Sequence, residues 1–295
     1  MISEEKLTLG PEAATKGAVV VTVQVSASPD KVWQSLTSAN GIAQWFGELN
    51  CDLKSGGRAR VDFGDGDFFD LDSIVLSPPN LINYDWRFLG IGPRDSITWK
   101  IEPNASGCLV TVEDVQPERT AEAALSLREG WLDFTHRLVE FHLTGQNMRY
   151  DWRRDLDVGL PISGSAEQVW IALFTPEAQK KWLPFKSPIE PDTCASVADN
   201  ATPEKISFAK VNWQPLRQVE FQVSSDTWKK PTTCRIELTA RNDDTLVYVS
   251  HNGWEGISDD PREQLEQRKR FCALWIESLK QAARLGEAGV MRQAL

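Results

Sequence analysis

Long hydrophobic runs are missing from this sequence of 295 residues. Its longest apolar stretches, at residues 18–21 and 271–275, are far shorter than the roughly 20 residues that a membrane-spanning helix needs. Residues 1–6 also lack the basic and then apolar order of a signal peptide. We therefore expect a cytoplasmic protein without a membrane span.

An excess of positive charge is missing too. The sequence has 32 Lys and Arg against 42 Asp and Glu, for a formal net charge of -10. Residues 1–150 hold 13 basic against 21 acidic side chains, and residues 151–295 hold 19 against 21. Nucleic acids and anionic membranes are bound by basic surfaces, so this charge balance argues against both as partners.

Cysteine and histidine are scarce, which limits metal and catalytic sites. The five cysteines form no C-x-x-C pair, so we expect reduced thiols. The three histidines, His136, His142 and His251, are not at metal-ligand spacing. The acidic stretch at residues 62–72 lacks the order of a calcium loop and is interpreted as a hairpin turn with solvated carboxylates. We therefore predict no metal, no cofactor and no catalytic constellation.

Tryptophan, by contrast, is abundant, with twelve in the sequence, and the tryptophans recur at a fixed spacing. Trp33 and Trp170 are 137 residues apart, as are Trp45 and Trp182. The same spacing joins Ser28 to Ser165, Leu36 to Leu173, Pro78 to Pro215, Tyr84 to Phe221, Leu109 to Leu246 and Val112 to Val249. It grows to 144 between Trp131 and Trp275, so the second copy has about seven extra residues. This repeat predicts two duplicated domains, residues 1–147 and 148–295.

Each copy has the same pattern of elements. A β-branched run such as residues 18–25 predicts a strand, followed by a helix that Ser28 caps in the first copy. The second copy has a capping box at Ser165 and Gln168. A second short helix, a meander of about six strands and a long amphipathic helix follow. The apolar stripe of the first long helix is Leu127, Trp131, Phe134, Leu138 and Phe141. An α+β unit results, in which the long helix packs on the concave face of the sheet.

These motifs resemble the AHSA1-type (activator of Hsp90 ATPase homologue) branch of the START-like, or SRPBCC, superfamily. The residues that carry the resemblance in the first copy are Ser28, Pro29, Val32, Trp33, Leu36, Thr37, Trp45, Phe46, Gly56, Gly57, Arg58, Pro78, Pro79, Leu81, Tyr84, Trp86, Gly130 and Trp131. The second copy diverges more, and residues 192–194 replace its double glycine. The resemblance implies two tandem helix-grip domains, each a curved antiparallel sheet wrapped around a long C-terminal helix, with a cavity between them. It fixes no activity, because the superfamily serves many functions.

A helix-grip cavity would need apolar and aromatic walls with a few polar anchors. The candidate ligand-binding residues are Trp182, Trp213, Trp228, His251, Trp254, Phe271, Trp275 and Ser278 in the second copy, and Trp45, Trp86 and Trp131 in the first. Aligned with the first long helix, the second has Ser278 and Ala282 in place of Phe134 and Leu138. We therefore expect the roomier pocket in the second domain.

Three classes of function remain open. The leading hypothesis is non-catalytic binding of an apolar or aromatic small molecule. The second is a protein-interaction module that docks on a chaperone of the Hsp90 type or on another protein. The third is an enzyme of the polyketide cyclase kind or a metabolite-resistance protein. Glu113 and Asp114 end a strand at a possible cavity mouth, where we expect the paired carboxylates to face solvent. His251, Glu113 or Asp114 in a large pocket would instead favour the enzyme.

Overall fold

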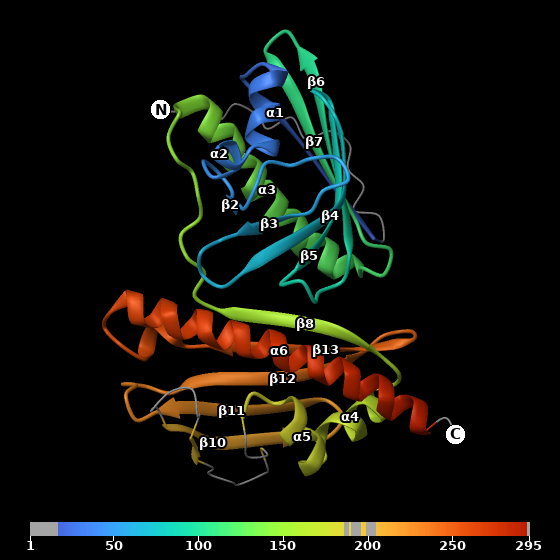
Figure 1. Ribbon diagram of the computed structural model, residues 1–295, viewed down its shortest axis with the longest axis vertical. Helices are drawn as coiled ribbons and strands as arrows, with labels where there is room; N and C mark the ends of the chain where they lie inside the picture. The colour runs from blue at the N-terminus through green and yellow to red at the C-terminus, as the bar shows by residue number, and fades with distance from the viewer. Residues whose placement is uncertain (1–16, 186–188, 190–195, 199–204, 294–295) are drawn as a thin grey trace. The chain divides into compact units, whose positions relative to one another are not determined.

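The computed structural model describes residues 17–185, 189, 196–198 and 205–293. Their contacts divide the chain into two compact units. One unit holds the described residues up to Gly64 together with Phe68–Asp151, and the other holds Asp65–Asp67 and the described residues from Trp152 onward. Each unit is a helix-grip fold, an antiparallel sheet with a long helix against one face, as predicted (Figure 1).

The first unit runs from a strand through two short helices to a meander and a long helix. Its elements are β1 (Ala18–Val25), α1 (Pro29–Thr37), α2 (Ala39–Ile42), β2 (Glu48–Leu49), β3 (Ala59–Asp62), β4 (Phe68–Ser77), β5 (Leu81–Phe88), β6 (Asp95–Asn104), β7 (Gly107–Val115) and α3 (Ala121–Thr144). The sheet order is β1-β7-β6-β5-β4-β3-β2, and every pair is antiparallel. The helices α1 and α2 therefore connect the two edges of the sheet.

The second unit repeats this order. Its elements are β8 (Leu156–Ser163), α4 (Ala166–Phe174), α5 (Pro176–Trp182), β9 (Ser196–Ala198), β10 (Lys205–Gln214), β11 (Gln218–Ser225), β12 (Thr232–Ala240), β13 (Asp244–Asn252), the 3-10 helix η1 (Trp254–Gly256) and α6 (Pro261–Gln293). The sheet order is β8-β13-β12-β11-β10-β9. The predicted departure from the family pattern at residues 192–194 lies outside the described residues.

Hydrophobic periodicity explains which faces are buried. In β1, Val19, Val21, Val23 and Val25 alternate with more exposed residues and point into the core, as the period of a strand requires. In the predicted stripe of α3, Trp131, Phe134 and Leu138 are buried, whereas Leu127 and Phe141 are partly buried and pack against the core. The apolar face of each long helix is therefore covered by its own unit, where α3 packs on β1 and α6 packs on β8.

Helix ends follow the capping signals in part. Ser165 and Gln168 form the predicted reciprocal capping box at the start of α4. Ser28 occupies the N-cap of α1 but makes no side-chain bond, and Pro29 follows at the first helical position. Gly145, with a φ of +70°, ends α3 in a left-handed conformation that suits glycine.

Candidate functional site

The interior of the first unit contains a column of stacked aromatic rings. The Phe69 and Trp86 ring centroids are 4.0 Å apart at an interplanar angle of 12°, and the Trp86 and Trp131 centroids are 5.2 Å apart at 13°. Trp99 contacts both Trp131 and Trp45 edge-on. The three candidate tryptophans of this unit, Trp45, Trp86 and Trp131, therefore lie in one aromatic core, fully buried or nearly so.

This core leaves little empty space. A cavity of only about 10 Å³ lies among side chains that include Trp45, Tyr84, Trp99 and Trp131. One water molecule needs roughly that volume, whereas a bound organic ligand needs on the order of 300 Å³ or more. Phe134 helps to fill the interior, since its ring packs 4.8 Å from that of Phe46. The described side chains around Trp45, Trp99 and Trp131 are therefore tightly packed.

A buried charged cluster lies beside the aromatic core. Asp114 was expected to face solvent with Glu113, but the structure corrects this expectation, because Asp114 is fully buried. Its carboxylate accepts hydrogen bonds from Trp131 Nε1 at 2.8 Å and from Arg119 Nη2 at 2.5 Å. The same Arg119 nitrogen lies 3.3 Å from Asp95 Oδ1. Two carboxylates therefore share one guanidinium group, whereas Glu113 lies half-exposed, 3.7 Å from Lys100 Nζ.

Burial changes the acidity of this cluster. Burial first, and then the nearby negative charge of Asp114, raise the pKa of Asp95 to about 7 against the opposing effect of Arg119. Burial also raises the pKa of Asp114, again opposed by Arg119. Asp95 and Arg119 were not predicted from the sequence, because nothing in their local pattern marks them as partners. The inward position of Asp95, at the start of β6, was the only available signal.

Five of the candidate residues in the second unit come together in a cage around His251. The His251 ring lies 4.3 Å from Trp254 and 5.0 Å from Phe271, and Trp275 is also in contact with it. Trp228 packs 5.8 Å from both Trp254 and Phe271. His251 is completely buried. We call His251, Trp228, Trp254, Phe271 and Trp275 the His251 cage.

Hydrogen bonds fix the protonation state of His251. Trp275 Nε1 donates to His251 Nδ1 at 3.2 Å, so the ring proton must be on Nε2. Nε2 then donates to Thr232 Oγ1 at 2.7 Å, and that hydroxyl donates to the carbonyl of Val223 at 3.3 Å. Burial lowers the pKa of His251 to about 3. The imidazole is therefore neutral at pH 7, and both of its nitrogens are used within the protein.

One polar atom of the cage has no partner. Trp228 is only 8% exposed, and its indole Nε1 finds no hydrogen-bond acceptor among the residues that the structure describes. The indole nitrogens of Trp254 and Trp275, by comparison, donate to the carbonyl oxygen and to Nδ1 of His251. Trp228 is therefore the position in the cage where an incoming acceptor would gain a bond.

The remaining candidates lie elsewhere in the second unit. Trp182 and Trp213 both contact Phe174, with centroids 5.8 and 5.7 Å away, and Trp213 also contacts Trp170. Trp170 and Phe174 were not among the predicted site residues, because their spacing on α4 is typical of an ordinary core face. Trp182 and Trp213 thus belong to a second aromatic cluster.

The small residues of α6 have a clear packing role at one end. Ser278 and Ala282 are buried, and Gly286 follows them at the same spacing of four. A Cβ atom at Gly286 would lie 2.4 Å from Ile162 Cγ2, so the helix approaches β8 very closely there. The close approach of α6 to β8 therefore fills part of the space that these small side chains leave.

Metal sites and membrane spans are both absent from the described part of the chain. Within those residues, no group of three His, Cys, Asp or Glu side chains is placed to hold a metal ion. No helix among them is long and apolar enough to cross a membrane.

Comparison with known proteins relates this geometry to a family. The model of the family described as Activator of Hsp90 ATPase homolog 1-like protein matches residues 26–142. No curated protein matches the chain. The crystal structure of DynU16, a protein of the dynemicin biosynthetic locus, is 30% identical with a TM-score of 0.80, over 92% of this chain and 100% of DynU16.

Two further solved structures are more distant. CalU16 from Micromonospora echinospora is 21% identical over 44% of this chain and 75% of its own, with a TM-score of 0.38. The di-domain ARO/CYC StfQ from the steffimycin biosynthetic pathway is 13% identical over 94% of this chain and 99% of its own, with a TM-score of 0.36. The DynU16 match extends over both helix-grip units, and the family model covers most of the first. The chain belongs to the AHSA1-type branch of the START-like (SRPBCC) superfamily.

Proposed function

We propose that the protein binds an apolar, aromatic small molecule without transforming it, and that the His251 cage of the second unit is part of the binding site. The observation that carries this proposal is the buried indole N–H of Trp228, which has no acceptor within the described residues. A buried donor without a partner costs about 1–3 kcal/mol. A ligand that brings an acceptor oxygen to Trp228 recovers that free energy.

The surroundings of Trp228 define the class of ligand. The neighbouring rings of Trp254 and Phe271 offer faces and edges on which a flat aromatic molecule can pack. His251 adds no charge, since it is neutral and its two nitrogens are occupied. The ligand is therefore an uncharged aromatic body with a carbonyl or hydroxyl oxygen.

Differences between the two long helices support the choice of the second unit. Phe134 and Leu138 of α3 are large side chains buried in the core of the first unit. The aligned residues of α6 are Ser278 and Ala282, which occupy less volume. The relationship to DynU16, a protein of a biosynthetic locus for a small molecule, also supports a small-molecule ligand.

The test is a binding titration of the full chain with anthraquinone and with 1-hydroxyanthraquinone, two uncharged aromatic diketones. Native mass spectrometry reports the bound mass, and tryptophan fluorescence reports the affinity. Trp228→Phe keeps an aromatic ring but removes the N–H, so we expect binding to weaken about threefold to tenfold. The matched control is Trp152→Phe, because Trp152 is 53% exposed. No bound mass with either probe, or equal affinity in Trp228→Phe, would refute the proposal.

A second candidate function, catalysis of the polyketide cyclase kind, is favoured by one observation. Asp95 and Asp114 form a buried carboxylate pair inside the first helix-grip unit, and the pKa of Asp95 is raised by burial to about 7. A carboxyl group with such a pKa can exchange a proton at neutral pH. Incubation with a poly-β-ketone thioester distinguishes the two functions, because a binder releases it with unchanged mass, whereas a cyclase that closes a ring by intramolecular aldol condensation releases one water and a correspondingly lighter product.

A further inference from the structure

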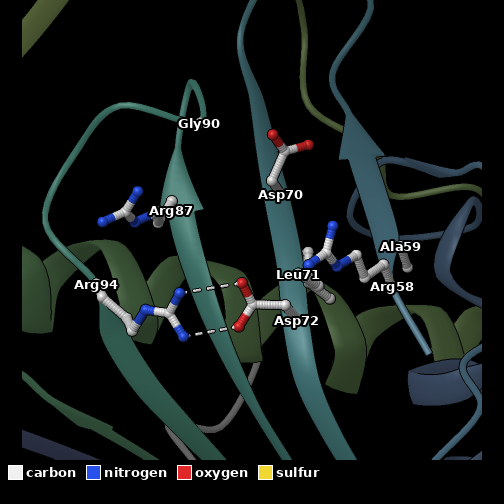
Figure 2. Close-up of a pocket in the computed structure, with 8 residues that line it drawn as sticks. All are labelled: Arg58, Ala59, Asp70, Leu71, Asp72, Arg87, Gly90 and Arg94. Carbon is white, nitrogen blue, oxygen red and sulfur yellow. Dashed lines mark hydrogen bonds and ion pairs between the residues drawn. The ribbon is translucent and has the colours of Figure 1, made fainter. Parts of the chain in front are cut away.

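An open groove of about 340 Å³ lies on the outer face of β3, β4 and β5 (Figure 2). Strand register explains which side chains reach it. The paired residues Ala59 and Leu71 face the core, so their neighbours Asp70 and Arg87, which pair across β4 and β5, face outward. The groove is lined by Arg58, Ala59, Asp70, Leu71, Asp72, Arg87, Gly90 and Arg94. Its lining shares only Leu71 with the small interior cavity of the first unit and includes no residue of the His251 cage.

The carboxylates of β4 and β5 are already neutralised. Arg60 holds Asp70 with two bonds, Nε to Oδ1 at 2.6 Å and Nη2 to Oδ2 at 3.0 Å. Asp72 and Asp85 lie directly opposite each other on β4 and β5, where like charges repel. Arg94 bridges the two, at 2.9 Å from Asp72 and 3.0 Å from Asp85, and Figure 2 shows its bonds to Asp72. Each carboxylate of these two strands therefore has a guanidinium partner.

Two arginines that line the groove have no carboxylate partner among the described residues. Arg58 and Arg87 line it and are exposed, and neither makes an ion pair in the part of the chain that the structure describes. This is unexpected for the more acidic half of the sequence. Four of the eight arginines among residues 1–150, namely Arg58, Arg60, Arg87 and Arg94, lie on this one face. Free positive charge is thus concentrated at the groove.

We propose that this groove binds an oxyanion, the carboxylate or phosphate group of a small molecule, between Arg58 and Arg87. A guanidinium group presents its N–H donors in a planar fork that matches such oxygens. The volume of the groove is at the lower end of the range for small-molecule sites, which fits a compact anion. The neutralised state of Asp70 and Asp72 removes the repulsion that free carboxylates would exert.

Gly90 keeps one side of the groove open. Its φ of +67° lies in the left-handed region, and a Cβ atom there would be 2.7 Å from Asp70 Oδ2. A side chain at this position would therefore push Asp70 away from Arg60. Since the Arg60–Asp70 pair is what leaves Arg87 without a partner on β4, Gly90 helps to preserve the free charge.

The experiment is an NMR titration of the ¹⁵N-labelled full chain with two probes, benzoate and inorganic phosphate. We expect millimolar binding with shifts at β3, β4 and β5, and weaker binding as salt is added. The double variant Arg58→Gln/Arg87→Gln should bind at least tenfold more weakly. The matched control is Arg235→Gln, because Arg235 is a comparably exposed strand arginine of the second unit that is bonded to Glu220.

The outcomes separate the sources of the anion. Tighter binding of benzoate indicates an organic acid, and tighter binding of phosphate indicates a phosphate ester. Either result supports the groove as an oxyanion site. The proposal is overturned if neither probe binds the full chain, or if the double variant binds as well as the Arg235→Gln control. Trp228→Phe should leave this binding unchanged, so the result is independent of the proposed small-molecule site.

Discussion

At the scale of single residues, His251 illustrates how burial changes the role of a side chain. Its neighbours supply a donor at Nδ1 and an acceptor at Nε2, and no carboxylate among the described residues pairs with the ring. The folded state therefore holds the neutral form, with the pKa lowered by burial to about 3 from an ordinary value of 6.5. His251 thereby makes folding depend on pH.

The first prediction concerns this pH dependence. Below pH 6.5 the unfolded chain binds a proton at His251 that the folded chain does not, so stability falls as the pH is lowered toward 3. Between pH 7 and pH 5 the loss is about 2 kcal/mol, from about 1.4 kcal/mol per pH unit. In His251→Gln this contribution disappears, so urea unfolding should show a smaller stability loss between these pH values.

The control for this measurement is His136→Gln, because His136 is on the surface of α3. The raised pKa of Asp95 acts in the opposite direction, since the folded state holds that proton more tightly and gains stability as the pH falls. Only the difference between variant and parent therefore isolates His251, and an unchanged pH slope in His251→Gln would contradict the assignment.

The second prediction concerns Asp114. In Asp114→Ala, the buried Arg119 keeps only Asp95 as a side-chain partner among the described residues, and Trp131 loses its acceptor. Breaking a buried ion pair from one side typically costs 3–5 kcal/mol, and urea unfolding should show a loss of about that size. Glu113→Ala on the outer face is the matched control, expected to change stability by less than about 0.5 kcal/mol. Equal effects of the two variants would contradict the buried cluster.

At the scale of elements, two helix glycines have opposite roles. A Cβ atom at Gly130 in α3 would meet no atom of the described residues within 4 Å apart from its chain neighbours and the adjacent backbone of its own helix, whereas a Cβ atom at Gly286 in α6 would meet Ile162 at 2.4 Å. The third prediction is that Gly130→Ala stabilises the protein by about 0.5–1 kcal/mol through helix propensity. Gly286→Ala should destabilise it by about 1–3 kcal/mol through overpacking. Thermal unfolding of the two variants gives the comparison, and a shift of the same sign in both would contradict the close approach of α6 to β8.

The element pattern was largely predictable from the sequence. The alternating valines of β1 and the apolar stripe of α3 reflect local periodicities of two and 3.6 residues. The repeat at a spacing of 137 residues then predicts the same order of helices and strands in the second unit. The resemblance to the AHSA1-type domain supplied the helix-grip arrangement. These features depend on nearby residues or on a whole repeated segment.

The buried charges were not predictable, because their partners are determined by tertiary contacts. Asp65 and Asp67 were expected to be solvated turn carboxylates, but they are 1% and 3% exposed, and Asp67 accepts a bond from Arg268 at 3.0 Å. Asp114 is a similar case, because its burial depends on Arg119 and Trp131. Alternation alone does not say which face of a strand can accommodate a charge.

The grouping of the aromatic candidates was also beyond the sequence. The sequence analysis predicts one set of cavity-lining residues that includes Trp182, Trp213, Trp228 and Trp254, but the structure divides these four between two clusters. Whether these residues contact a ligand stays a prediction. Arg58 entered the sequence argument only through the family motif, and the free charge of Arg58 and Arg87 becomes visible only when strand register places them on one face.

At the scale of the whole molecule, the fourth prediction concerns the residue at which the first unit ends and the second begins. The repeat predicts a boundary after residue 147, whereas contacts place Met148 to Asp151 with the first unit. Met148 N–H donates to the carbonyl of Gln44 at 2.7 Å, and the Tyr150 ring packs 5.3 Å from that of Phe134. We expect a fragment of residues 1–151 to melt several degrees above a fragment of residues 1–147. Equal melting temperatures would favour the boundary from the repeat.

The stacked rings of Trp86 and Trp131 have an optical consequence. Two indoles 5.2 Å apart and nearly parallel share their electronic excitation, so their transitions couple and excitation energy passes between them. The near-ultraviolet circular dichroism of the protein should therefore contain a contribution from this pair, alongside that of Trp99, whose ring contacts Trp131. Trp86→Phe removes the coupling of the stacked pair, and the difference spectrum between parent and variant would be a spectroscopic probe of the first unit in a chain of twelve tryptophans.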